Sequence, residues 1–145
     1  MEKTNLYTYI IFEGNDDFPL EVVTDRLQIQ PTETWEVGDR IAPNHPINKR
    51  VQSYTAWKYT IAKETVDSDD VLCPLLEVFR NKTHIINELK EELNVDIRLE
   101  LVIYIYDGHS PGLFIHPEFA QFTSAINTGL DIDMYVYSFS EPEEY

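Results

Sequence analysis

The sequence is poor in cysteine, in glycine-rich motifs and in long apolar runs, and each scarcity excludes a class of protein. Cys73 is the only cysteine, so no intramolecular disulfide can form and a reducing compartment is the expected setting. The five glycines are scattered, and none belongs to a phosphate-binding loop or to the elbow that presents a nucleophilic serine. The apolar runs are too short to cross a bilayer, and the first residues do not resemble a signal peptide, so we expect a cytoplasmic protein.

Positive charge is scarce as well. Eleven Lys and Arg residues stand against 26 Asp and Glu residues, which leaves a formal net charge of -15 at pH 7. Such a chain repels phosphate backbones and anionic lipid headgroups, so we expect neither a nucleic-acid partner nor a membrane partner. It attracts basic proteins and cations, although acidity also keeps many proteins soluble without any partner.

The hydrophobic periodicity predicts a single domain over residues 1–139, followed by an acidic tail at 140–145. Strand-like patterns of apolar and β-branched residues lie at 6–13, 34–37, 53–63, 95–107, 113–116 and 131–139. Helical spacing of apolar residues indicates helices at 18–30, 71–94 and 117–128, with a candidate break in the longest one at Asn81-Lys82-Thr83. This order favours an α+β fold in which a single, largely antiparallel sheet has helices packed on one face.

Tyrosine pairs recur on three of the predicted strands. The pairs are Tyr7 with Tyr9, Tyr104 with Tyr106, and Tyr135 with Tyr137, and the last pair shares its strand face with Asp131 and Asp133. We predict that they lie on an exposed sheet face, which Trp57 joins if the register of its strand agrees. The alternating positions Ile103, Ile105, Met134 and Val136 are then expected beneath the helices. Tyr and Trp are enriched at protein interfaces, but cross-strand aromatic pairs also stabilise exposed sheets without any partner.

Four stretches, spread in order over nearly the whole chain, carry a family resemblance. They are Leu27-Gln28-Ile29-Gln30-Pro31-Thr32, Gly38-Asp39, the strand around Trp57, and the closing run from Pro111-Gly112-Leu113 to Leu130-Asp131-Ile132-Asp133-Met134-Tyr135. In these features the chain resembles the bacterial family catalogued as domain of unknown function 4279. The resemblance implies a small bacterial α+β protein and assigns no activity to it.

Candidate chemistry is sparse. Asp131 and Asp133 lie about 7 Å apart on one strand face, a spacing that suits acid–base catalysis only within a cleft. Cys73 lies among apolar neighbours and is expected to be a buried, inert thiol. A hairpin could bring His109 and His116 together with Asp107, but none of the four histidines has a metal-binding spacing; they are His45, His84, His109 and His116. We therefore predict no catalytic residue, no metal site and no cofactor.

The sequence thus favours a non-catalytic protein-interaction module. Its partner is another protein or a second copy of the chain, and its predicted binding residues are Trp57, Tyr104, Tyr106, Asp131, Asp133, Tyr135 and Tyr137. An acidic inhibitor or immunity-type protein that binds a basic toxin is one concrete form, because opposite charge speeds encounter. The alternative is a small enzyme or small-molecule binder that uses the Asp131/Asp133 face or the Asp107–His116 hairpin.

Overall fold

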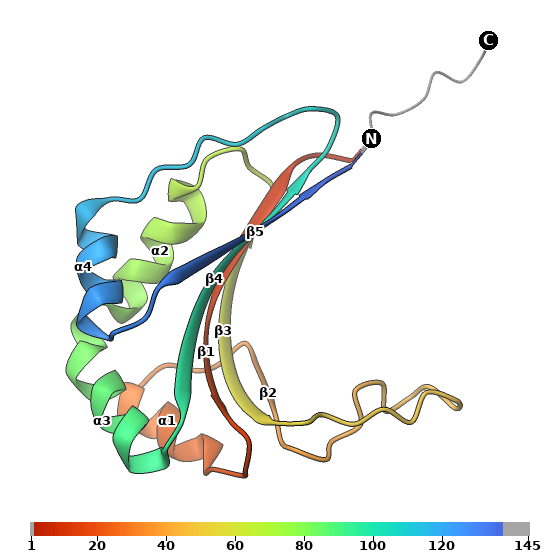
Figure 1. The fold of residues 1–145 in the computed structure, drawn as a ribbon, viewed down its shortest axis with the longest axis vertical. Helices are drawn as coiled ribbons and strands as arrows, with labels where there is room; N and C mark the ends of the chain where they lie inside the picture. Colours follow the sequence, from red (N-terminus) through yellow and green to blue (C-terminus); the bar gives the residue numbers. More distant parts are fainter. Residues whose placement is uncertain (1, 138–145) are drawn as a thin grey trace.

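The computed structural model describes residues 2–137, and within this range a five-stranded sheet carries its helices on one face (Figure 1). In chain order the elements are β1 (Asn5–Gly14), α1 (Leu20–Leu27), β2 (Glu33–Trp35), β3 (Thr55–Lys63), α2 (Asp69–Phe79), the short 3-10 helix η1 (Arg80–Lys82), α3 (Thr83–Leu93), β4 (Asp96–Ile105), α4 (Pro117–Ala125) and β5 (Leu130–Val136). The predicted α+β fold with helices on one face is confirmed.

The strands lie in the order β2-β3-β1-β4-β5 across the sheet. Neighbouring strands are antiparallel except β4 and β5, which run parallel. A parallel pair needs a crossover connection, and the segment containing α4 supplies it. The sheet is therefore largely antiparallel, as predicted, and β1 occupies its centre between β3 and β4.

The main hydrophobic core lies between the sheet and the helix layer. Alternate strand residues such as Ile10 of β1 and Leu101 of β4 point into it, because successive side chains of a strand face opposite sides. The helices contribute their apolar stripes, with Phe79 of α2 and Leu89 of α3 fully buried. The side chains that alternate with these core residues therefore lie on the opposite face of the sheet, away from the helices.

Trp57 belongs to this core, so its predicted place on the exposed tyrosine face is wrong. Its side chain is fully buried, and its ring meets those of Phe12 and Phe79 edge to face. Its Nε1 donates a hydrogen bond to Thr24 Oγ1 at 2.9 Å. The register decides the face, because Trp57 lies directly opposite the buried Phe12 on β1. Trp57 therefore stabilises the fold rather than a binding surface.

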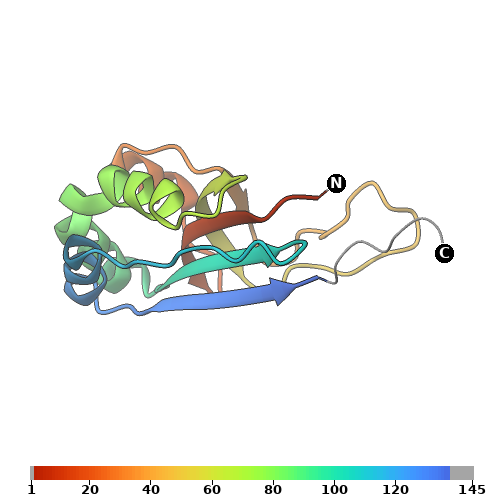
Figure 2. The same cartoon turned by 90° about the horizontal axis from the view of Figure 1, so that it is seen from above.

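β5 is an edge strand whose helix-facing side stays open to solvent. Met134 is 50% exposed and Val136 is 72% exposed, so the prediction that both lie beneath the helices is wrong. The reason is the position of the helix layer: α2 packs on β1 and β3, and α4 packs on α2, while β5 runs away from α4 along the edge (Figure 2). Ile103 and Ile105 on the neighbouring β4 are buried, as predicted.

The connecting segments agree with the predictions only in part. The break in the long helix is confirmed, since η1 separates α2 from α3. The strand predicted at 113–116 is not formed; Gly112 makes one isolated bridge with Asp67, and the chain then runs irregularly to α4. The predicted acidic tail at 140–145 and the end of the strand predicted at 131–139 lie outside the described residues. Among the helices of residues 2–137, none is both long and apolar enough to cross a membrane.

The connection between β2 and β3, residues 36–54, forms an arm that projects from the sheet on the side away from the helices (Figures 1 and 2). Arg40 holds it together: its backbone bridges to Val51, and its guanidinium donates hydrogen bonds to the carbonyls of His45 and Asn48 at 2.7 and 2.8 Å. Exposed apolar residues nevertheless lie along the arm, namely Ile41, Ile47 and Val51.

Candidate binding face

The sheet face opposite the helices, which we call the open face, carries the side chains that alternate with the core residues. Along the paired strands it comprises Tyr7, Tyr9, Ile11 and Glu13 of β1, Ala56 and Lys58 of β3, Arg98, Glu100, Val102 and Tyr104 of β4, and Asp131, Asp133 and Tyr135 of β5. Within residues 2–137 no helix covers this face (Figure 1).

A row of tyrosines in ring contact crosses one end of the open face. Tyr7 contacts Tyr104 on the next strand with ring centroids 6.0 Å apart, and Tyr104 stacks on Tyr135 of β5 at 5.4 Å. Beyond the strand ends, Tyr106 stacks on Tyr137 at 4.7 Å with nearly parallel rings. The four tyrosines predicted to share one side of the sheet therefore do so, and we call this set with Tyr7 the tyrosine row.

Asp131 and Asp133 lie beside the tyrosine row on β5, exposed and on the same face, as the alternation predicts. In the register of the parallel pair, Asp131 is opposite Glu100 and Asp133 is opposite Val102. Neither residue lines the large hollow described below. Their arrangement therefore adds exposed negative charge to the face outside this hollow.

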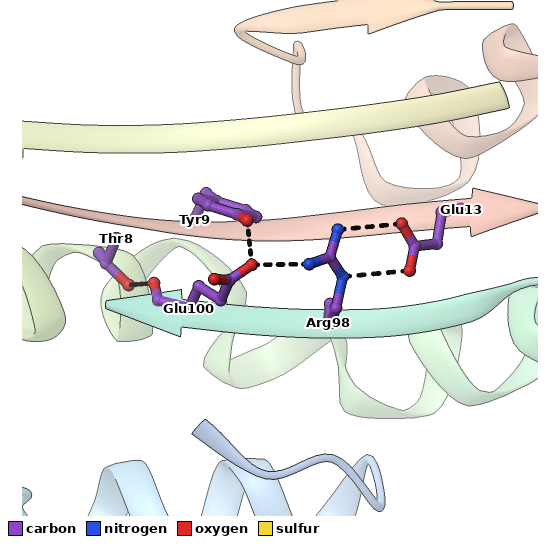
Figure 3. A network of polar contacts seen from close by, with 5 residues as sticks. All are labelled: Thr8, Tyr9, Glu13, Arg98 and Glu100. Atoms are coloured by element: carbon purple, nitrogen blue, oxygen red, sulfur yellow. Dashed lines mark hydrogen bonds and ion pairs between the residues drawn. The ribbon is translucent and has the colours of Figure 1, made fainter. Parts of the chain in front are cut away.

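A partly buried polar network runs along the open face to the end where β1 ends and β4 begins, and the sequence patterns did not reveal it (Figure 3). The Arg98 guanidinium meets both carboxylate oxygens of Glu13 at 3.1 Å and reaches Glu100 Oε2 at 2.8 Å. The Tyr9 hydroxyl donates a hydrogen bond to the same Glu100 oxygen. Glu100 is only 7% exposed. A buried carboxylate needs partners, and here the Arg98 guanidinium and the Tyr9 hydroxyl both donate hydrogen bonds to it.

Electrostatics in this network favour one protonation state. Burial, reinforced by the hydrogen bond to Glu100, raises the pKa of Tyr9, and burial with a contribution from Tyr104 raises the pKa of Tyr7 to about 12. Although burial opposes it, the hydrogen bond to Glu13 raises the pKa of Arg98. Lys58 Nζ lies 4.2 Å from the centroid of the Tyr9 ring, which is a cation–π contact. The phenols therefore stay neutral and the guanidinium stays charged near neutral pH.

An acidic hollow of about 680 Å³ opens at the end of the sheet, where β1 ends and β4 begins. Four carboxylates and one guanidinium line it, contributed by Glu13, Asp16, Asp17, Asp96 and Arg98. Two of these residues, Glu13 and Arg98, also belong to the network, so the hollow continues the open face. Its net negative lining suits a cationic group rather than an anionic one.

Trp35 of β2 and Tyr54 complete this end of the open face. Their rings meet edge to face with centroids 5.6 Å apart, and both pack beside Ile11 and Ala56. The Trp35 Nε1 is buried and finds no hydrogen-bond acceptor among residues 2–137. The strand predicted at 34–37 was the available signal for this residue, but a three-residue strand has too little alternation to assign its face.

His116, from the hairpin proposed around Asp107, belongs to a cluster with Asp69 and Cys73. His116 places its Nε2 at 3.0 and 3.1 Å from the two carboxylate oxygens of Asp69. Cys73 is half-buried rather than buried, because it faces this pair and not the sheet. Burial, followed by the charge of Asp69, raises the pKa of the Cys73 thiol, which makes it a poor nucleophile at neutral pH.

The comparisons with known proteins agree with the family resemblance of the sequence. No curated protein and no solved structure matches the chain. The family described as domain of unknown function (DUF4279) matches residues 4–137, a range that includes β1, β5 and the whole open face between them. Because this match covers most of the 145 residues, the chain belongs to the DUF4279 family.

Proposed function

We propose that this protein is a non-catalytic binding module whose open face binds a basic segment of another protein. The observation that carries the proposal is the tyrosine row, which places aromatic rings from three strands in contact on a face without a helix cover in the described chain. Tyr135 and Tyr137 remain 48% and 43% exposed. A contiguous, solvent-facing aromatic surface of this kind is typical of a binding site, because Tyr contributes contact area at low conformational cost.

Charge defines the chemistry of the partner. Asp131 and Asp133 flank the row, and the adjoining hollow carries four carboxylates against one guanidinium. The whole chain adds a net charge of -15, which speeds the approach of a positively charged protein. A segment rich in Lys and Arg therefore fits this face better than an acidic or purely apolar one.

The open face already contains the type of contact that such a segment would make. Lys58 lies over the Tyr9 ring at 4.2 Å within the protein itself. A Lys or Arg of the partner would stack in the same way on the exposed rings of Tyr135 and Tyr137, with Asp133 close by as a carboxylate partner. An acidic inhibitor or immunity-type protein that covers the basic surface of a toxin is one function that uses these contacts.

The test selects peptides from a random display library on the immobilised protein and measures their affinities by titration calorimetry. We expect the selected peptides to be enriched in Lys and Arg, and their binding to weaken as salt concentration rises. The double variant Tyr106→Ala/Tyr135→Ala should lose roughly tenfold or more in affinity, as expected when two interface aromatics are truncated. The free energy of unfolding should fall by less than the free energy of binding, since Tyr135 lies on the edge strand β5 and Tyr106 lies beyond the end of β4.

Met134→Ala/Val136→Ala is the matched control, because both residues belong to β5, are at least as exposed as Tyr135, and alternate with the tyrosines. This control should keep its affinity within about twofold. Selected peptides without basic residues, or equal losses in the two double variants, would refute the proposal. Sedimentation velocity supplies a further outcome: a dimer that dissociates in Tyr106→Ala/Tyr135→Ala would assign the face to a second copy of the chain, whose arm carries Arg40, Lys49 and Arg50.

A further inference from the structure

A second cluster of reactive side chains lies in the helix layer, on the opposite side of the sheet from the open face. Asp69 and Cys73 are four residues apart on α2 and therefore share a helix face. His116, the residue immediately before α4, meets them there. One ligand atom from each of the three residues lies within 4.8 Å of the other two, and all three side chains are half-buried.

Backbone hydrogen bonds hold the two contributing segments together. Gly112 donates its N–H to the Val66 carbonyl at 2.7 Å and accepts from the Ser68 N–H at 3.1 Å. Two residues further on, the Phe114 N–H donates to Ser68 Oγ at 3.0 Å. These bonds join the start of α2 to the segment that carries His116. Backbone contacts, and not only contacts between the three side chains, therefore hold the cluster together.

The imidazole itself is also oriented. The Phe114 ring packs edge to face against the His116 ring, with centroids 4.6 Å apart. Both carboxylate oxygens of Asp69 lie within 3.1 Å of His116 Nε2. The edge-to-face ring packing and the contact with the Asp69 carboxylate together keep Nε2 directed at the cluster.

We propose that Asp69, Cys73 and His116 bind a divalent transition-metal ion of the Zn²⁺ type, with a fourth coordination position left to an exchangeable ligand. The mixed set of thiolate, imidazole and carboxylate favours zinc over magnesium or calcium, which prefer oxygen ligands alone. Three protein ligands with a fourth position open to water or another ligand differ from a structural zinc site, in which four protein ligands close the coordination sphere.

The distances need only a small adjustment to receive the ion. Tetrahedral zinc with ligands at about 2.0–2.3 Å requires donor atoms roughly 3.3–3.8 Å apart. Asp69 and His116 lie 3.0 Å apart at their nearest ligand atoms, and the Cys73 sulfur lies within 4.8 Å of a ligand atom of each. On binding, the Cys73 thiol loses its proton to solvent and its sulfur coordinates as thiolate. A neutral His116 then carries its ring proton on Nδ1, which frees Nε2 for the metal.

Charge around the cluster also favours a cation. The carboxylates of Asp67, Glu77 and Glu118 act electrostatically on the Cys73 sulfur in addition to Asp69. Bound zinc with thiolate and carboxylate ligands is neutral at the first coordination sphere, so these further acids leave an overall negative site that retains the ion. In the alternative, Asp69 and His116 form only an ion pair and Cys73 is an inert thiol beside it. The experiment distinguishes the two, because it detects whether the sulfur binds the metal.

The test titrates the metal-free, full-length protein with Co²⁺ and follows the thiolate-to-cobalt charge-transfer band in the near ultraviolet, with Zn²⁺ competition to obtain the zinc affinity. We expect one ion per chain. Cys73→Ser should remove the charge-transfer band, and His116→Ala and Asp69→Asn should each weaken zinc binding roughly 100-fold or more, since even supporting residues of metal sites cost up to that much. Thermal unfolding of each variant without metal checks that it is folded, and the two ligand variants provide independent evidence if one is unstable.

His84→Ala is the matched control. His84 Nε2 also lies 3.0 Å from a carboxylate, that of Glu88, but the single cysteine, Cys73, belongs to the other cluster. Its metal affinity should match that of the unmodified protein. The absence of a charge-transfer band, an undiminished affinity in His116→Ala, or an equal loss in His84→Ala would each overturn the site. These readouts do not involve the open face, so failure here leaves the peptide-binding proposal intact, and failure there leaves this one.

Discussion

The ion pair of Arg98 with Glu100 allows a quantitative prediction of the stability lost when Arg98 is replaced, because the Glu100 side chain is buried and that of Arg98 is partly exposed. Arg98→Met keeps the length of the side chain and removes its charge, which leaves the Glu100 carboxylate with the Tyr9 hydroxyl as its remaining partner in the network. Breaking a buried pair from one side costs about 3–5 kcal/mol. The Glu100 side chain is 9% exposed but that of Arg98 is 39% exposed, so we discount this figure to about 2 kcal/mol.

A double-mutant cycle separates this cost from simple loss of packing. Glu100→Gln keeps an acceptor for Tyr9 and should cost about 1 kcal/mol, the value of a hydrogen bond to a charged partner lost to a neutral one. In the double variant Glu100 is already neutral, so removing Arg98 leaves no unpaired charge. The free energy of unfolding should therefore fall by less than the sum of the two single decreases, by about 1 kcal/mol or more. Urea unfolding at pH 7, followed by circular dichroism and by the fluorescence of the buried Trp57, measures all three values.

Arg26→Met is the control for this cycle. Arg26 also reaches two carboxylates, Glu88 and Glu92, at 2.6 and 2.7 Å, but these partners are 40% and 53% exposed. Exposed pairs contribute little, so Arg26→Met should leave the free energy of unfolding nearly unchanged. If Arg98→Met were equally mild, or if the cycle gave strictly additive losses, the burial of Glu100 would not carry the energy that we assign to it.

Three further predictions follow from the core and the tyrosines. Ile103→Ala should lower the free energy of unfolding by about 2–5 kcal/mol in urea titrations, because Ile103 is fully buried; a loss below about 1 kcal/mol would contradict its place in the core. Trp57→Phe should cost about 1–3 kcal/mol by the same measurement, since it removes both buried ring area and the hydrogen bond to Thr24, and Thr24→Val should remove part of the same energy. The pKa of Tyr7 is about 12 in the folded protein and 10.0 unfolded, so its contribution is intact below pH 10 and is lost as the pH rises towards 12. Unfolding measured at pH 9 and pH 11 should show a fall in stability that Tyr7→Phe reduces; an unchanged fall would assign it to other groups.

The period-two alternation of the sequence was sufficient to assign the faces of the central strands. On β4 and at the residue after it, the buried Ile103 and Ile105 alternate with Tyr104 and Tyr106, and the structure places the two sets on opposite sides. The prediction succeeds there because a strand with neighbours on both sides must bury one complete face. The same rule assigned Tyr135 of β5, and Tyr137 just after it, to the correct side.

Alternation failed where another element decides the outcome. Trp57 was grouped with the tyrosines, but its face depends on its register against Phe12, which strand sequences do not encode individually. Met134 and Val136 have the pattern of a buried face, yet burial also requires a helix above them, and the helix layer is centred on β1 and β3. Register and layer position are properties of the assembled sheet, so a pattern within one strand cannot supply them.

The two sites that the structure adds combine residues that are distant in sequence. Glu13 and Arg98 are 85 residues apart, and they meet because β1 and β4 pair in an antiparallel register that brings both to one end of the open face. Asp69 and His116 are 47 residues apart, and the backbone bonds of Gly112 bring them together. Asp69 and Cys73 are four residues apart and share one helix face, but the sequence analysis did not identify them as half of a site. The pair becomes a candidate zinc site only with the His116 imidazole from the other segment, because zinc sites in proteins have at least three protein ligands.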